Sequence, residues 1–65
     1  MVQKIIEVVG RSGKSFADAA KDAVAAAAKT VRGMRWARVS EMEMELKDNK
    51  VLDYRATVKV YFEIE

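Results

Sequence analysis

Few side chains in this 65-residue chain could carry out covalent chemistry. The sequence has no cysteine and no histidine, which excludes disulfides, Cys/His zinc sites, cysteine nucleophiles and histidine bases together. What remains is a row of glutamates at alternate positions, Glu41, Glu43 and Glu45. Carboxylate oxygens suit a hard divalent cation, but a solvated strand face produces the same alternation, and we favour that interpretation. We therefore expect no enzymatic activity, assign no catalytic residue and leave any metal ligand open.

Trp36 is the only tryptophan and the first candidate for binding a ligand. Core packing is the commoner fate of a lone tryptophan. A small unit built largely of alanine, however, has little room to bury an indole. The alternative is that Trp36 is a platform for a planar ligand or a second copy of the chain, because aromatic rings prefer offset-stacked contacts.

Arg55 is the second candidate, in the middle of a strand-like segment. Its guanidinium could donate hydrogen bonds to ring carbonyls or to a phosphate. The plainer interpretation is a cross-strand ion pair with one of the glutamates at positions 41, 43 and 45, a contact that is common and weak.

One β-α-β-β domain over residues 1–65 must position these side chains. Alternating or β-branched apolar residues predict three strands, and an alanine-rich amphipathic stretch predicts one helix. The expected strands are 2–9, 35–47 and 51–65, the helix runs from about 16 to 32, and turns lie at 10–15 and 48–50. Ser15 with Asp18 predicts the N-terminal cap of the helix and Gly33 its C-terminal cap. The result is an α+β fold with a three-stranded antiparallel sheet, in which the first strand lies beside the third or the second.

The strand patterns also predict which faces are covered. In the third strand the even-numbered residues from Leu52 to Ile64 are mainly apolar, and the odd-numbered ones from Asp53 onward are mainly polar. In the second strand Val39 falls on the opposite parity to Met42, so a bulge near Ser40 or a bend is expected.

Size and charge limit the partners. A chain of 65 residues without disulfides or a structural metal is marginal alone, which favours oligomerisation. The net charge is +2 and the basic residues are spread along the chain, so nucleic acid is not expected as a partner. The apolar run at 23–28 is too short to span a membrane, and residues 2–9 do not have the pattern of a signal peptide. We therefore expect a cytoplasmic protein.

Five stretches of the chain, in this order, resemble the dodecin family. They are the opening VQKIIEVVG, the helix start S-x-x-S-F-x-D-A-A, the helix end A-x-x-T-V-R-G, the strand opening R-W-A-R-V and the ending YRATVKVYFEIE. The resemblance implies a β-α-β-β subunit whose sheet wraps the helix, and assembly into a hollow homododecamer. It also implies flavins stacked in pairs between the tryptophans of neighbouring subunits, which stores the flavin and quenches its photochemistry. Trp36 occupies the position of that tryptophan.

Other positions follow from the resemblance residue by residue. Gln3, Lys4 and Glu45 align with positions that line the flavin pocket and its aperture. Arg55 stands where many flavin-binding members have a glutamine that hydrogen-bonds the isoalloxazine edge. Members that favour phosphorylated flavin have arginines where this chain has Glu43 and Glu63. The two carboxylates would repel a phosphate, so riboflavin or its breakdown product lumichrome is expected over FMN.

A different class of function remains open. Some relatives with arginine at position 55 lack the tryptophan, and one type is linked to calcium. The alternative is therefore a cation-binding or purely structural shell that uses no flavin, based on Arg55 and the row of glutamates at 41, 43 and 45. Retention of Trp36 favours flavin.

Overall fold

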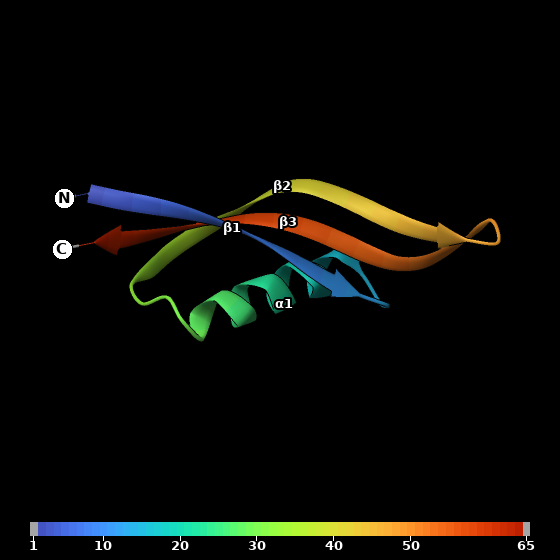
Figure 1. Cartoon of the computed structure of the whole chain (residues 1–65), viewed down its shortest axis with the longest axis horizontal. Coiled ribbons are helices and arrows are strands. Elements are labelled where there is room, and N and C mark those ends of the chain that lie inside the picture. The colour runs from blue at the N-terminus through green and yellow to red at the C-terminus, as the bar shows by residue number, and fades with distance from the viewer. Residues whose placement is uncertain (1, 65) are drawn as a thin grey trace.

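The computed structural model describes residues 2–64, which form one helix against one antiparallel sheet (Figure 1). The elements are β1 (Val2–Ser12), α1 (Phe16–Ala28), β2 (Met34–Lys47) and β3 (Lys50–Ile64). The strand order is β1-β3-β2, and both pairings are antiparallel. The predicted β-α-β-β order, antiparallel sheet and β2–β3 hairpin are confirmed. Of the two neighbours left open for the first strand, the third is the one it pairs with.

The strands β2 and β3 each begin one residue earlier than predicted, at Met34 and Lys50, and two other predicted boundaries were wrong by three or four residues. The turn expected at 10–15 begins only after Ser12, because Gly10 to Ser12 continue the pairing with Ala56 to Tyr54. The helix expected to reach residue 32 ends at Ala28, where the backbone tightens and the amide of Thr30 donates to the carbonyl of Ala27 at 3.1 Å. The β-branched residues that follow, Thr30 and Val31, are poor helix formers because their χ1 angles are restricted.

The two ends of the helix follow different rules. At the N-terminus the Ser15 hydroxyl accepts a hydrogen bond from the Asp18 amide at 3.0 Å, so the predicted cap is confirmed. At the C-terminus Lys29, not Gly33, is the cap residue. Gly33 lies in the following loop with φ +74°, and its carbonyl accepts a hydrogen bond from the Glu63 amide at 3.2 Å. Its left-handed conformation therefore serves the entry into β2. No helix within residues 2–64 has the length and hydropathy needed to cross a membrane.

The core is thin and made of small residues. One face of α1 packs its alanines against three residues of the central strand β3. The buried set is Ala19, Ala23, Ala27, Ala56, Val58 and Val60. Gly10 lets β1 approach the helix closely, because a Cβ there would overlap the Ala19 carbonyl oxygen and lie 2.8 Å from the Ala23 amide nitrogen. The helix therefore sits over β1 and β3.

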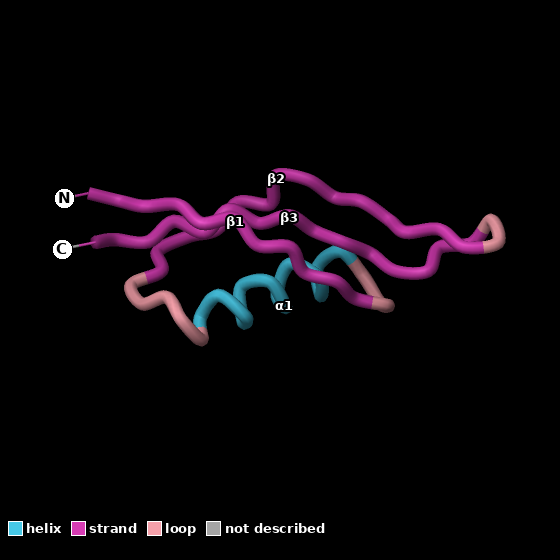
Figure 2. Tube along the Cα trace, in the orientation of Figure 1, coloured by secondary structure: helices cyan, strands magenta, loops and turns pink. Residues whose placement is uncertain are grey.

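The helix leaves β2 largely uncovered. In Figures 1 and 2 the β2–β3 hairpin extends well beyond α1, and the two ends of the chain lie together at the other end of the molecule. Of the bulge and the bend left open near Ser40, the structure has the bulge, because the register with β3 shifts between Val39 and Glu41. Because of this shift, the apolar residues before Ser40 and those after it lie on the same face of the sheet, the face that the helix covers in part (the helix-side face). We call Val39, Met42, Met44 and Leu46, which are 45–64% exposed, the apolar row.

Candidate functional site

The face of the sheet opposite the helix carries nearly all the side chains that could recognise a ligand. We call it the open face. Its residues on β3 alternate with the buried Ala56, Val58 and Val60, as the parity of the sequence predicted. The open-face residues of β3 are Asp53, Arg55, Thr57, Lys59, Tyr61 and Glu63, and the register places residues of β1 and β2 on either side of them.

An aromatic pair lies at one end of the open face. Trp36 on β2 is opposite Tyr61 on β3, with ring centroids 4.5 Å apart and ring planes 13° from parallel. The Arg38 guanidinium carbon lies 5.9 Å from the centroid of the Tyr61 ring. Trp36 is 48% exposed, so the core-packing interpretation is wrong for the isolated subunit. The indole instead forms a platform.

The Trp36 platform has one covered ring face. Adjacent strands are about 4.7–4.9 Å apart, close to the distance between the two ring centroids, so the stack runs across the strands. Tyr61 is on the central strand and Trp36 on the edge strand β2. The ring face of Trp36 that is not against Tyr61 is therefore directed toward the free edge of the sheet, where a planar ligand or another subunit can approach.

A charged network lies at the other end of the open face. Arg11 donates to Asp53 Oδ2 from Nε at 3.0 Å and from Nη2 at 2.8 Å. Arg55 Nε lies 3.5 Å from Asp53 Oδ1, and its Nη2 donates to Glu45 Oε1. The cross-strand ion pair considered for Arg55 is therefore present, with Glu45 as its partner.

Asp53 is the buried centre of this network, with only 7% of the residue exposed. The hydrogen bond from Arg11 is the main reason why the pKa of Asp53 lies below its ordinary value of 3.8, and the charges of Arg11 and Arg55 add to it against the opposing effect of burial. The buried atoms Asp53 Oδ1 and Arg55 Nε have no hydrogen-bond partner within the described chain. The two atoms face each other at 3.5 Å, so they form an ion pair without a hydrogen bond.

The two ends of the open face do not meet within one chain. Tyr61 and Arg55 are six residues apart on β3, a distance of about 20 Å at about 3.3 Å per residue. Trp36, which is opposite Tyr61, and Arg55 therefore belong to separate ends of the open face within one subunit.

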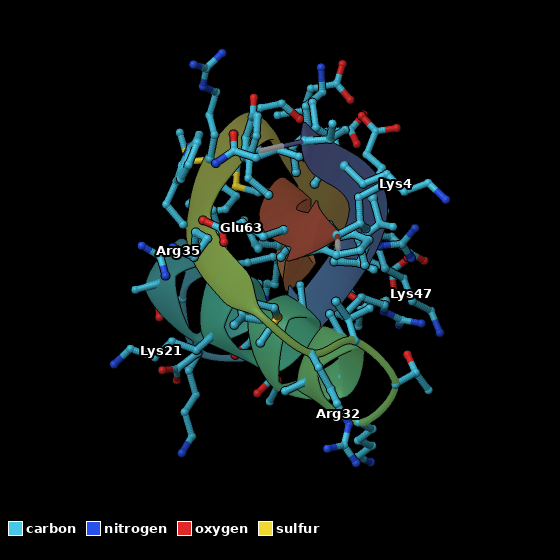
Figure 3. All side chains as sticks on the ribbon, turned by 90° about the vertical axis from the view of Figure 1, so that its left-hand side faces the viewer. Lys4, Lys21, Arg32, Arg35, Lys47 and Glu63 are labelled. Carbon is cyan, nitrogen blue, oxygen red and sulfur yellow. The ribbon has the colours of Figure 1, made fainter. Side chains whose placement is uncertain are left out.

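The remaining site candidates lie near one end or the other. Gln3 pairs with Glu63 on the open face, near the aromatic pair, whereas Lys4 pairs with Phe62 and belongs to the helix-side face. Figure 3, viewed from this end, shows Arg35 and Glu63 close to each other and Lys4 on the opposite side. Arg35 Nε is 3.4 Å from Glu63 Oε1. The roles of Gln3 and Lys4 stay predictions.

The row of glutamates is a solvated face in this structure. Glu41, Glu43 and Glu45 pair with Thr57, Arg55 and Asp53 on the open face and are all exposed. Among residues 2–64, no group of three or more carboxylates is close enough to hold a metal ion.

Sequence reasoning missed two contacts. It put Tyr61 on the polar face but not against Trp36, because the register there depends on a shift at Arg35 that the residue pattern does not reveal. It also missed the pairing of Arg11 with Asp53, because Arg11 was assigned to a turn instead of to β1.

The fold defines a class of small subunit with one helix on a three-stranded antiparallel sheet. The family model described as Dodecin matches residues 2–65. The chain therefore belongs to the dodecin family.

Individual relatives agree with this assignment. The calcium dodecin of Mycobacterium tuberculosis is 35% identical over 63 residues, which are 97% of this chain and 89% of the relative. Its crystal structure, described as having a novel calcium-binding site, superposes with a TM-score of 0.86 at 34% identity, covering 100% of this chain and 93% of that one. The tt0972 protein from Thermus thermophilus gives a TM-score of 0.91 at 33% identity, covering 98% and 94%.

Proposed function

We propose that this protein binds and stores a flavin, and that it protects the cell from flavin photochemistry by holding the ring against Trp36. The observation that carries the proposal is the geometry of the indole, which is 48% exposed with one ring face covered by Tyr61 and the other open. A flat isoalloxazine ring fits such a platform, because offset stacking of aromatic rings is favourable. The protein acts by binding and does not turn over a substrate.

The binding site lies between subunits of a closed homo-oligomer, a dodecamer in the assembly we propose. Two observations support this arrangement. Trp36 and Arg55 belong to parts of the sheet about 20 Å apart within one chain, which favours a site that takes the two residues from different copies. The apolar row is 45–64% exposed on a subunit with a thin core, and apolar surface of this kind marks an interface between protein chains.

Riboflavin is the preferred ligand, lumichrome is a second candidate, and FMN binds less well. The open face carries Glu43 opposite Arg55 and Glu63 opposite Gln3. Arg35 partly compensates Glu63 at 3.4 Å, and Arg55 is already held by Glu45 and Asp53. A phosphate at either place would therefore meet a carboxylate whose neighbouring arginine is already ion-paired, which disfavours its charge.

Arg55 can donate hydrogen bonds to the flavin in this site. Its Nη2 donates to Glu45 and its Nε faces Asp53, and a guanidinium has five N–H donors, so Arg55 can donate from Nη1 to a flavin carbonyl while these ion pairs hold it in place. Glu45 therefore orients Arg55. Gln3 contributes from the open face, and Lys4, which lies on the helix-side face, contributes at the aperture between subunits.

The proposal is tested by calorimetric titration of riboflavin into the protein and into Trp36→Ala and Trp36→Phe. Losing the indole removes the stack, worth about 0.5–1.5 kcal/mol, together with its buried area, so Trp36→Ala should bind at least about 10-fold more weakly. Trp36→Phe keeps a ring and should fall in between. Equal affinity for the protein and Trp36→Ala would refute the stacking site.

A second candidate function is calcium binding by a shell that uses no flavin. It is favoured by the row of exposed glutamates at 41, 43 and 45 and by the similarity to the calcium dodecin of M. tuberculosis. Since one subunit holds no preformed carboxylate cluster within residues 2–64, the ligands would have to come from several copies. A calcium-dependent rise in melting temperature without riboflavin uptake would favour this function over the first.

A further inference from the structure

We infer that Tyr61 is a positioning residue for the ligand site, a ring that backs Trp36 and keeps its indole oriented for stacking. This inference rests on the proposed flavin function and adds a residue to it. Tyr61 itself does not touch the flavin in this arrangement, because Trp36 lies between the two rings.

The position of Tyr61 in the sheet makes it a rigid support. It is on the central strand, with Ile5 of β1 on one side and Trp36 of β2 on the other. The ring is partly buried, and Arg38 lies 5.9 Å from its centroid. Neighbours on the open face therefore restrict the Tyr61 ring, whereas Trp36 on the edge strand has a strand on one side only.

The contact with Tyr61 restricts the indole before a ligand arrives. The two rings are 13° from parallel with centroids 4.5 Å apart, so the Trp36 plane is fixed across the strand direction with its outer face free. Without the tyrosine ring, the indole of an edge strand would sample several staggered rotamers. Binding a flavin would then have to order the indole as well.

The expected effect follows from that ordering cost. Fixing one mobile side chain at a binding site costs about 0.5–1.5 kcal/mol, which converts to an affinity loss of about 2- to 12-fold at about 1.4 kcal/mol per factor of ten. Tyr61→Ala and Tyr61→Leu should both show this loss, the second with most of the apolar bulk retained. Tyr61→Phe keeps the ring and should bind like the unmodified protein.

The experiment measures riboflavin affinity and the emission anisotropy of Trp36 in the assembled protein, its Tyr61 variants and Trp36→Ala. Because Trp36 is the only tryptophan, its emission in the ligand-free protein reports this side chain alone. We expect lower Trp36 anisotropy and a 2- to 12-fold weaker Kd in Tyr61→Leu, with both values restored in Tyr61→Phe. Matching melting temperatures would show that the fold is intact.

Three other outcomes overturn the inference in distinguishable ways. If Tyr61→Leu matches the unmodified protein in anisotropy and Kd while Trp36→Ala loses binding, Tyr61 is no support and the flavin site stands. If Tyr61→Leu binds more tightly, the tyrosine competes with the flavin for the indole. If Trp36→Ala binds like the unmodified protein, or if nothing binds riboflavin, the proposed function fails and the role of Tyr61 fails with it.

Discussion

Gly10→Ala tests how closely the helix approaches the sheet. A Cβ at this position would overlap the carbonyl oxygen of Ala19 and lie 2.8 Å from the amide nitrogen of Ala23, whereas ordinary contacts begin at 3.4 Å. Both atoms belong to the backbone of α1, so no side chain can rotate away. The helix would have to move by about 0.6 Å to bring the Ala23 amide nitrogen from 2.8 Å to an ordinary contact distance of 3.4 Å. It would have to move further to relieve the overlap with the Ala19 carbonyl oxygen.

Such a movement opens the thin core. The contact between α1 and β3 consists of alanines and valines that are at most 4% exposed, and they lose packing as soon as the helix lifts. Overpacking of a core costs about 1–3 kcal/mol, and the upper end applies here because the clash is with backbone. For a domain of this size, about 3 kcal/mol corresponds to a fall of about 12–24 °C in melting temperature.

The assay is thermal denaturation at one fixed subunit concentration, since assembly makes the melting temperature depend on concentration. Gly13→Ala is the matched control, because a Cβ at Gly13 has no atom within 4 Å. We expect Gly13→Ala to melt within about 4 °C of the unmodified protein. A fall smaller than about 4 °C for Gly10→Ala would refute the close approach of β1 to α1.

Two further predictions concern the charged network and the apolar row. The pKa of Asp53 is lowered below 3.8, mainly by the hydrogen bond from Arg11, so its ionised form stabilises the fold above pH 3.8 and this contribution is lost as the pH falls through the lowered value. Acid unfolding curves of the protein and Asp53→Asn should therefore differ most above pH 3.8 and converge below it, and a constant difference at all pH values would contradict this role. Met42→Lys places a cation in the apolar row and should reduce the molar mass measured by light scattering, whereas Met42→Leu should not. Unchanged mass for Met42→Lys would mean that the apolar row is not an interface.

Local patterns were enough to predict most of the fold. The alternation on both sides of Ser40 predicted the bulge, and Ser15 with Asp18 predicted where the helix begins. The end of the helix was harder to predict, because Gly33 has the left-handed conformation typical of a cap but uses it five residues after Ala28. The alanines predicted a helix that continues to residue 32, whereas the helix ends before the β-branched Thr30 and Val31.

The sequence predicted which single residues belong to the site, but not most of the contacts between them. Trp36 and Arg55 stood out by type, and the ion pair of Arg55 with a β2 glutamate followed from strand pairing. The support of Trp36 by Tyr61 depends on the register between β2 and β3, and the hydrogen bonds of Asp53 come from Arg11, which is 42 residues away in sequence. The separation of Trp36 from Arg55 could not be predicted, because it depends on the register that puts Trp36 opposite Tyr61.

The most direct test of the flavin site is the emission of riboflavin at saturating protein. A flavin stacked on Trp36 should lose most of its fluorescence, and the emission should return when Trp36→Ala is used at the same concentration. Riboflavin that keeps its full free emission in the presence of excess protein would contradict the stacked-flavin site and favour the calcium-binding or structural shell.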